Sequence, residues 1–354
     1  MTADTVGGVW TYALELTAAL AGRDVEVTLA AMGPGLGPEQ RAEAGVSRAR
    51  RVYAERFRLE WMEEPWEDVE RAGEWLLRIA EEVEPDVVHL NGYAHAALPW
   101  GVPVLVVGHS CVCSWHEAVR GEPAGAQWSR YREEVARGLA AADLVVAPSA
   151  TMLAALARHY AFAGERLVIA NGRRAPASAA RAKEPLVVSA GRLWDEAKNV
   201  AAVEGAAVGL PWPVLLAGEG SQERSRGNVG RLGRLSAGEL RELLARASIF
   251  AHPARYEPFG LAPLEAGLAG CALVLGEIES LREVWGDAAL YVDPDDEPGL
   301  ARVLRELVED RARREAFGAR ARERAARYTP ERMAAGYSRA YSRLYSRRPA
   351  AAAS

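Results

Sequence analysis

The feature of this sequence that most restricts its fold is an alternation of short apolar runs with longer amphipathic stretches. The run "DLVVAP" at 143–148 is one example, and "WEDVERAGEWLLRIAEEV" at 66–83 has the apolar spacing of a helix. Strands this apolar are buried on both faces, as in a parallel sheet whose crossovers are helices. The pattern predicts α/β domains built on doubly wound parallel sheets.

The alternation occurs twice along the chain, which predicts two Rossmann-like domains. Strands are expected at 25–32, 86–90, 103–109, 143–148 and 166–171, and again at 186–191, 213–218, 248–253, 271–276 and 289–293. Residues 173–185 are rich in Ala, Pro and Arg without periodicity, so they are interpreted as a linker. The predicted domains are residues 1–172 and 186–329, which suits a chain of 354 residues. Two such domains would face each other across a cleft, with ligands beyond the carboxyl ends of the strands.

Composition excludes several classes of protein. The formal net charge of −5 argues against a nucleic-acid partner. The longest apolar runs fall short of the roughly 18–20 residues of a membrane span, and no secretory signal pattern is visible. Three Cys residues, an odd and sparse count, favour reduced thiols and a cytoplasmic protein.

Two carboxylates in the second half mark the clearest candidate site. Glu257 and Glu265 lie eight residues apart in "ARYEPFGLAPLEAG", where a helix is expected to begin near Gly260 with Pro263 in its first turn. Glu257 would precede the helix and Glu265 would lie on it. The free N–H groups of a helix N-terminus suit a diphosphate, and flanking carboxylates suit sugar hydroxyls. A plain helix start with nearby acidic residues is the alternative.

Two cations follow the strand expected at 186–191. Arg192 and Lys198 lie in "SAGRLWDEAKN", and the chain has only one other lysine, Lys183. Arg forms forked contacts with phosphate oxygens, whereas Lys supplies a point charge. A surface lysine at a helix start remains the simpler alternative.

These motifs together resemble the nucleotide-binding domain of retaining GT-B glycosyltransferases of family 4. The resemblance rests on "GRLWDEAKN", on "NVGRLGRLSAGELRELLARASIFAHPARYEPFGLAPLEAGLAGCALVL", and on the E-x7-E pattern that Glu257 and Glu265 match. It covers nearly the whole chain, most tightly at 186–295. It implies a GT-B fold, with residues 1–172 binding the acceptor and residues 186–329 binding the nucleotide sugar.

The resemblance also implies roles for individual residues. Arg192 and Lys198 would hold the donor diphosphate and stabilise the leaving group, Glu257 would contact the donor sugar, and Glu265 the ribose. Other donor-side residues implied in the second half are Glu219, Arg234, Phe259, Gly260 and Leu261. No metal or other cofactor is expected, because the cations and the helix N-terminus supply the positive charge.

The first half would supply the other side of the site. "VGGVWTYALELTAAL" matches the family's glycine loop, so Gly7 and Gly8 are expected beside the donor diphosphate, and His109 beside the reacting sugar carbon. Only six residues precede Gly7, which leaves about "MTA" for the first strand and suggests a truncated strand or a start further upstream. Because aromatic faces stack on sugars, Trp10 and Trp115 are candidate acceptor contacts.

One stretch of the first half suggests a different chemistry. His109, Cys111, Cys113 and His116 lie within "HSCVCSWH", and in an extended segment the first three would share one face. A zinc site is therefore considered. The single spacing of the thiols is unusual for one, so buried free thiols are favoured.

Two further segments have recognisable patterns. The helix expected at 330–347, with Thr329 as N-cap and Pro330 and Glu331 in its first turn, would return to the first domain. The stretch 47–58 contains five Arg residues among apolar ones. It is interpreted as a strand with solvated edges; the alternative is peripheral contact with anionic lipid at the inner face of a membrane.

The function expected from the resemblance is transfer of a hexose from a nucleotide diphosphate sugar to a hydroxyl of an unknown acceptor, which could be a glycan, a lipid or a small molecule. Attack on the same face as the leaving group is expected, assisted by the departing phosphate. Two alternatives stay open: a GT-B nucleotide-sugar epimerase and a non-catalytic nucleotide-sugar binding protein. The sequence leaves donor base, sugar and oligomeric state undetermined.

Overall fold

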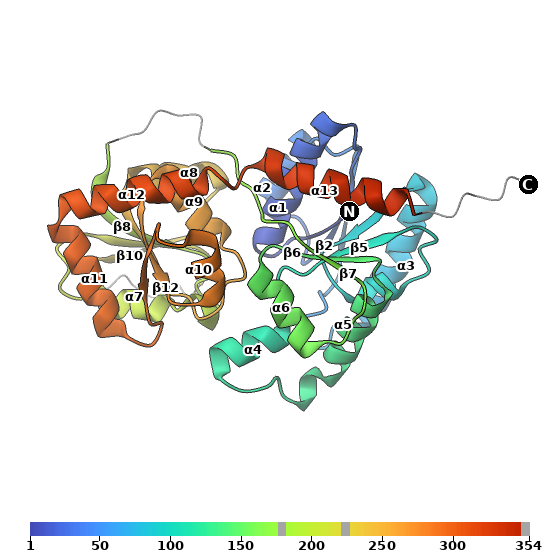
Figure 1. Cartoon of the computed structure of the whole chain (residues 1–354), viewed down its shortest axis with the longest axis horizontal. Helices are drawn as coiled ribbons and strands as arrows, with labels where there is room; N and C mark the ends of the chain where they lie inside the picture. The colour runs from blue at the N-terminus through green and yellow to red at the C-terminus, as the bar shows by residue number, and fades with distance from the viewer. Residues whose placement is uncertain (176–181, 221–226, 348–354) are drawn as a thin grey trace, which may run out of the picture. The chain divides into compact units, whose positions relative to one another are not determined.

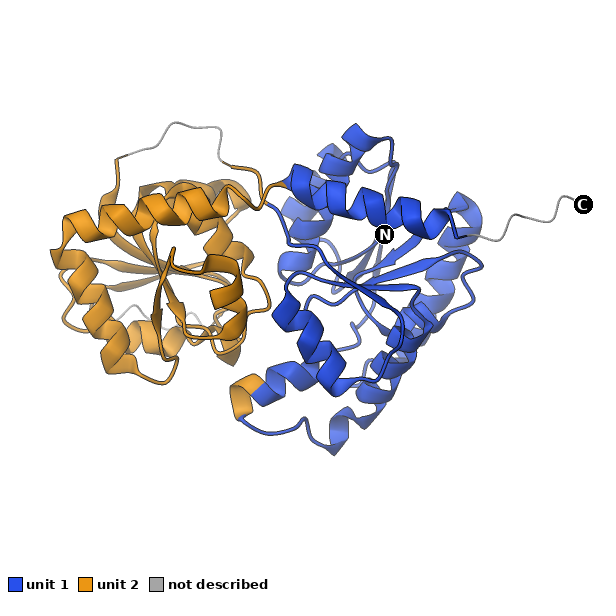
Figure 2. Cartoon of the chain, in the orientation of Figure 1, with its two compact units in different colours: residues 1–117, 121–172, 330–354 blue, residues 118–120, 173–329 orange. Residues whose placement is uncertain are grey.

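The computed structural model describes residues 1–175, 182–220 and 227–347, and divides the chain into two compact units. Unit 1 comprises residues 1–117, 121–172 and 330–354, and unit 2 comprises residues 118–120 and 173–329 (Figure 2). Part of the predicted linker, residues 176–181, lies outside the described residues. The linker ends two residues earlier than predicted, because a strand of unit 2 already begins at Glu184.

Unit 1 consists of parallel strands covered by helices, as the apolar runs predict (Figure 1). Its strands are β1 (Thr2–Asp4), β2 (Thr28–Gly33), β3 (Arg51–Arg56), β4 (Val88–Leu90), β5 (Val104–Val107), β6 (Leu144–Ala147) and β7 (Glu165–Val168). Its α-helices are α1 (Gly8–Leu20), α2 (Pro38–Val46), α3 (Trp66–Val83), α4 (Val112–Arg120, whose last three residues cluster with unit 2), α5 (Ser129–Ala141), α6 (Ala150–His159) and α13 (Pro330–Tyr345).

The strands of unit 1 form two parallel sheets, ordered β1-β2-β3 and β4-β5-β6-β7. β1 is as short as expected and pairs only with β2. Asn91, which follows β4, joins the two sheets: its backbone N–H donates to Thr2 Oγ1 at 2.8 Å and its amide group donates to the Thr2 carbonyl at 2.6 Å. The side chains of Thr2 and Asn91 thus supply the polar connection at the edge of this three-residue strand.

Residues of β2 alternate between two cores. Leu29 and Ala31 pack with α1 and α13 on one face, while Ala30 and Met32 pack with α3 on the other. Burial on both faces explains why the strand has no polar alternation. α13 follows Thr329 with Pro330 and Glu331 in its first turn, packs against α1 and belongs to unit 1.

Unit 2 is a single six-stranded parallel sheet with helices on both faces (Figure 1). Its strands are β8 (Glu184–Ala190), β9 (Val214–Ala217), β10 (Val229–Gly233), β11 (Ala247–His252), β12 (Ala272–Gly276) and β13 (Leu290–Val292). Its helices are η4 (Glu196–Lys198, a 3-10 turn), α7 (Val200–Ala206), α8 (Ala237–Arg246), α9 (Leu261–Ala269), α10 (Glu279–Trp285), α11 (Glu297–Glu309) and α12 (Arg311–Ala325).

The strand order of unit 2 is β10-β9-β8-β11-β12-β13, with every neighbouring pair parallel. This is a doubly wound order, because the direction of winding reverses between β8 and β11. Helices α7 and α11 pack together on one face, and α8, α9 and α12 on the other. The α/β prediction is therefore confirmed, and each predicted apolar run overlaps an observed strand.

One strand was not predicted. β10, "VGRLG", contains two glycines and an arginine, and among the described strands it lies at the sheet edge, paired only with β9. An edge strand is buried on one side only, so it lacks the continuous apolar run by which the central strands are recognised.

The basic stretch 47–58 contains the exposed edge strand β3, as the strand interpretation predicted. Arg50 pairs with Glu26 at 2.8 Å, and Arg51 pairs with Glu82. These carboxylates offset part of the positive charge that would attract anionic lipid. Among the described residues, no helix combines the length and the apolar character that a membrane span requires.

Candidate functional site

The candidate site of unit 2 lies where the strand order reverses, between β8 and β11. The loop after β8 carries Arg192 and Lys198, and the loop after β11 carries Glu257. Asn199 ties these loops together, because its amide donates to the carbonyls of Pro253, at 3.0 Å, and Pro294, at 2.7 Å. Ligands of open α/β sheets bind in the crevice at this reversal.

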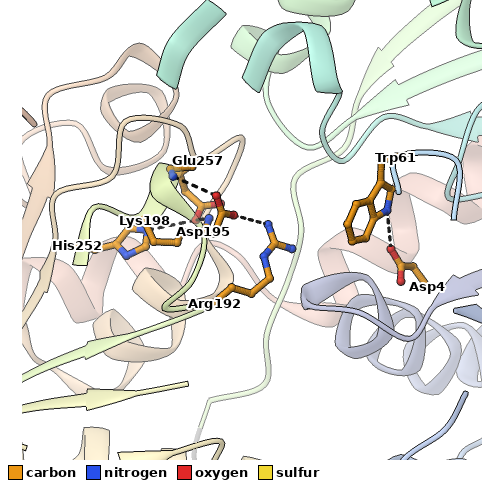
Figure 3. A network of polar contacts seen from close by, with 8 residues as sticks. Asp4, Trp61, Arg192, Asp195, Lys198, His252 and Glu257 are labelled. Atoms are coloured by element: carbon orange, nitrogen blue, oxygen red, sulfur yellow. Dashed lines mark hydrogen bonds and ion pairs between the residues drawn. The ribbon is translucent and has the colours of Figure 1, made fainter. Parts of the chain in front are cut away.

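A cation, a carboxylate and an imidazole converge at the centre of the candidate site in unit 2 (Figure 3). Lys198 Nζ donates to Glu257 Oε2 at 2.8 Å, and His252 Nε2 donates to the same oxygen at 3.2 Å. The Lys198 and Glu257 side chains are each 14% exposed, and His252 is fully buried at the carboxyl end of β11. The pair is therefore shielded from water but still reachable from the surface.

The charge state of Glu257 follows from these contacts. Burial alone would raise the pKa of the carboxyl, but the Lys198 charge and the hydrogen bond from His252 outweigh it and hold the pKa well below its usual range. Glu257 is thus a carboxylate at neutral pH, able to accept hydrogen bonds from hydroxyl groups but not to donate a proton.

Arg192 lies at the start of the loop that follows β8, and its side chain is held in place. Its Nη2 donates to Asp195 Oδ2 at 2.7 Å, and its guanidinium lies 5.4 Å from the centre of the exposed Trp194 ring. Arg192 Nε, although buried, makes no hydrogen bond among the described residues. The side chain is thus oriented by Asp195 and retains donors for an anion.

The N-terminus of α9 borders the site. Gly260 is its N-cap with φ +91°, a conformation that glycine adopts without strain. Leu261 begins the helix, Pro263 lies in its first turn, and that turn contains no acidic residue. The predicted helix start is confirmed, with backbone N–H groups at Leu261 and Ala262 that α9 itself does not use. Such a terminus favours an anion.

Glu265 lies one turn further along α9. Its carboxylate forms an ion pair with Arg173, the Nη2–Oε1 distance being 2.6 Å. The loop residue Phe259 is buried, and its ring packs edge-on against Tyr328 with the ring centres 5.4 Å apart. Phe259 therefore shapes the loop from within rather than presenting its ring to a ligand.

The remaining donor-side residues of unit 2 lie on neighbouring loops. Glu219 follows β9 and Arg234 follows β10, and both are exposed. Leu193 N–H donates to the Glu219 carbonyl at 2.8 Å, which connects the loop after β9 to the Arg192 loop. The structure thus brings Arg192, Lys198, Glu257 and the start of α9 together, with Glu219 and Arg234 at the margin.

In unit 1 the predicted residues lie after β1 and β5. Gly7, with φ +82°, caps α1, and Gly8 begins it, both exposed. His109 follows β5, its Nε2 donates to Asn91 Oδ1 at 2.9 Å, and its ring meets Tyr12 edge-on at 4.5 Å. Burial lowers the pKa of His109 well below its usual value, so the ring is neutral and its Nδ1 is an acceptor.

His89 is a second neutral imidazole beside His109. It is 3% exposed, its Nδ1 accepts from the Tyr341 hydroxyl at 2.6 Å, and its Nε2 lies 3.3 Å from Asn91 Oδ1. Burial, assisted by the N-terminal ammonium and His109, lowers the pKa of His89 well below its usual value. Asn91 Oδ1 thus receives both imidazole N–H groups.

This burial predicts a pH dependence of stability. Below about pH 6.5 the unfolded chain binds a proton at His89 that the folded chain does not, so the free energy of unfolding falls as pH decreases. Urea denaturation between pH 7 and 5 gives the free energy of unfolding of wild type and of His89→Asn at each pH. The plot of this free energy against pH should be steeper for wild type by up to ~1.4 kcal/mol per pH unit. The control is His159→Gln, since the His159 ring contacts the exposed Glu117. Equal slopes for wild type and His89→Asn would contradict the assignment.

Of the two tryptophans proposed for an acceptor, the structure excludes one. Trp10 is 3% exposed in the core between α1 and its neighbours, with Nε1 donating to Glu43 Oε2 at 2.6 Å. Its ring has no free face for a sugar because the apolar side of α1 carries it inward, so this expectation is corrected. Trp115, on α4, is half-buried and meets His116 edge-on at 5.2 Å.

The Cys stretch is not extended, which removes the geometric basis for a zinc site. Cys111 is the N-cap of α4, where its Sγ accepts from Ser114 N–H at 3.2 Å, and Cys113 lies inside the helix. Cys113 Sγ accepts from the Tyr160 hydroxyl at 3.3 Å, and burial raises the pKa of the Cys111 thiol. Within the part of the chain that the structure describes, no three His, Cys, Asp or Glu side chains are grouped to hold a metal ion.

Sequence reasoning missed the partners of the predicted residues. These are His252 beside Glu257, Asp195 beside Arg192, Arg173 beside Glu265 and Asn91 beside His109. Two of them carried a usable signal: His252 ends an apolar strand, and Asp195 lies three residues after Arg192. The others come from distant segments, so only the fold places them.

Comparison with known proteins follows the division of the chain. Residues 6–173 match the family model described as Glycosyltransferase Family 4, and residues 174–324 match the one described as Glycosyl transferases group 1. Alpha-maltose-1-phosphate synthase of Mycobacterium tuberculosis is 36% identical over 99 residues, which cover 26% of this chain and 26% of that protein. The chain thus matches about a quarter of that curated relative's length.

Solved structures resemble the chain over nearly its whole length. Sucrose-phosphate synthase from Thermosynechococcus elongatus has a TM-score of 0.75 at 20% identity, covering 95% of this chain and 93% of its own. The Anabaena protein HepE, crystallised with UDP-glucose, has a TM-score of 0.74 at 16% identity, covering 97% and 100%. At these identities the likeness concerns the fold.

Proposed function

Since the chain belongs to the GT-B glycosyltransferases, we propose that it transfers a hexosyl group from a nucleotide diphosphate sugar to a hydroxyl of an acceptor, retaining the anomeric configuration. The GT-B fold expected from the sequence is confirmed. The observation that carries the proposal is the convergence of Lys198, Glu257 and His252 where the sheet of unit 2 reverses, next to the free N–H groups of α9.

The donor diphosphate is assigned to Arg192, Lys198 and the start of α9. Lys198 has three N–H donors and Glu257 accepts one, so the ammonium can hold the carboxylate and a phosphate oxygen together. Arg192 offers its unpaired Nε. As the bond to the sugar breaks, negative charge grows on the departing phosphate, and these fixed donors stabilise it. The same positive charge supports metal-independent transfer, which undiminished activity in excess EDTA would test.

Glu257 is assigned to the hydroxyls of the donor sugar and Glu265 to those of the ribose. Both carboxylates are held by cations, at 2.8 and 2.6 Å respectively. A carboxylate neutralised in this way is a weaker nucleophile toward the anomeric carbon. This supports same-face attack by the acceptor, with the departing phosphate taking its proton, rather than double displacement through a glycosyl-enzyme.

The acceptor is assigned to unit 1. Of the other residues of unit 1, Gly7 and Gly8, with exposed N–H groups at the start of α1, are assigned to the donor diphosphate. Neutral His109, whose Nδ1 can accept a hydrogen bond, is assigned to the reacting sugar carbon. Trp115 remains the proposed aromatic contact. Because the Anabaena protein HepE was crystallised with UDP-glucose, a uridine donor is the first to try, followed by guanosine and adenosine donors.

The test follows the sugar released from each donor. UDP-, GDP- and ADP-hexoses are incubated with the protein, and the anomeric protons are recorded by NMR before mutarotation. Slow release of the α-hexose from an α-donor supports a retaining transferase, and early β-hexose would contradict retention. An isomerised nucleotide sugar would indicate an epimerase. Tight binding without release or isomerisation would indicate a binding protein.

A further inference from the structure

Arg173 begins the main segment of unit 2, residues 173–329, and its side chain is directed at a predicted ligand contact. Its Nη2 lies 2.6 Å from Glu265 Oε1, and the Arg173 and Glu265 side chains are 15% and 22% exposed. In the sequence, "NGRR" at 171–174 gave no reason to connect this arginine with a carboxylate on α9 92 residues later.

The backbone of Arg173 is fixed as well as its side chain. Its N–H donates to the Tyr328 carbonyl at 3.0 Å, and the Tyr328 hydroxyl donates to the Val284 carbonyl at 2.9 Å. Tyr328 also packs against Phe259, in the loop that precedes α9. The guanidinium therefore approaches Glu265 from a segment that is itself anchored beside the loop.

We propose that Arg173 is a positioning residue for ribose recognition: it holds the Glu265 carboxylate so that the remaining lone pairs accept hydrogen bonds from the 2′- and 3′-hydroxyls of a nucleoside diphosphate. This inference rests on the proposed function, which assigns Glu265 to the ribose. A carboxylate offers about four acceptor positions, so an arginine on one oxygen leaves room for two hydroxyls.

Two physical effects make the arginine matter. A free glutamate side chain loses rotamer freedom when a ligand orders it, and an ion pair formed beforehand removes that loss from binding. The ion pair also fixes the direction of the Glu265 carboxylate, and hydrogen bonds to a carboxylate are stronger than those to a neutral acceptor.

The experiment compares a ribonucleotide with its dideoxy counterpart. Calorimetry first identifies which of UDP, GDP and ADP binds wild type most tightly, and then measures that diphosphate and its 2′,3′-dideoxy form on every variant. Wild type should prefer the ribonucleotide by about 10-fold or more. Arg173→Met should reduce this ratio at least three-fold, Arg173→Lys should restore part of it, and affinity for the dideoxy form should change little.

Arg174→Met is the matched control, because Arg174 is the exposed neighbour and should keep the wild-type ratio. Melting temperatures within a few degrees show that the variants stay folded. An unchanged ribose preference in Arg173→Met overturns the inference while leaving the proposed function standing, and tighter ribonucleotide binding overturns it in favour of competition between Arg173 and the ribose. Equal binding of both forms by wild type overturns the ribose assignment itself, and no binding of any diphosphate overturns the proposed function.

Discussion

Lys198→Met is expected to lower the kcat/KM of sugar transfer by about 10²–10³, the usual effect of removing one donor that faces developing negative charge. Methionine keeps most of the length and apolar character of the side chain but cannot donate to Glu257 or to a phosphate oxygen. The measurement is steady-state release of the nucleoside diphosphate with the best donor of the NMR screen.

The chain supplies a matched control for this variant. Its only other lysine, Lys183, lies just before β8, whereas Lys198 follows that strand's carboxyl end. Lys183 Nζ donates to the Leu244 carbonyl at 3.0 Å and lies 3.6 Å from Cys271 Sγ. Lys183→Met should therefore keep transfer within about three-fold of wild type. Equal losses in both variants would show that the effect of Lys198 is structural.

A double variant separates charge balance from catalysis. Lys198→Met leaves Glu257, whose side chain is 14% exposed, without its ammonium partner, and this destabilises the fold. Lys198→Met combined with Glu257→Gln removes both charges, so the melting temperature should recover while transfer stays low. If transfer recovers with stability, neither residue acts on the donor.

Gly218→Ala is expected to lower the free energy of unfolding by roughly 3–5 kcal/mol, among the largest effects of any single substitution. Gly218 follows β9 with φ +147°, and a Cβ there would lie 1.7 Å from the Gly191 carbonyl oxygen, a backbone atom of the Arg192 loop. Relief requires the chain to move at Gly191 or Gly218, so donor binding should weaken as well. Urea denaturation and donor titration measure the two effects.

Gly209→Ala measures the cost of backbone strain without a steric clash, so it serves as the control for Gly218→Ala. Gly209 lies in unit 2 with φ +79°, but nothing comes within 4 Å of a Cβ placed there. Its cost should be about 1–2 kcal/mol, the penalty of a left-handed conformation alone. Similar losses for the two variants would mean that the approach of Gly218 to Gly191 does not limit stability.

The sequence predicted best what depends on local pattern. Apolar runs located the central strands, because a strand buried on both faces has no polar position. The helix predicted at 66–83 begins and ends at the same residues as α3. The start of α9 was predicted from Gly260 and Pro263, which placed Glu257 before the helix and Glu265 on it. These are consequences of backbone geometry within a few residues.

The partners of the site residues could not be predicted, because they come from segments that only tertiary structure brings together. Nothing near Glu265 in the sequence points to Arg173, and nothing near His109 points to Asn91. The error at Trp10 has a related cause. Proximity to the glycine loop suggested a ligand contact, but the apolar face of α1 turns the ring into the core.

We propose that the reversal point of the unit 2 sheet binds the donor diphosphate, and a crystal structure with the tightest-binding diphosphate among UDP, GDP and ADP would locate that diphosphate. We expect a β-phosphate oxygen within hydrogen-bond distance of Lys198 Nζ and of a backbone N–H at the start of α9, with the ribose hydroxyls on Glu265. A diphosphate bound elsewhere, or one whose oxygens contact neither Lys198 nor α9, would contradict it.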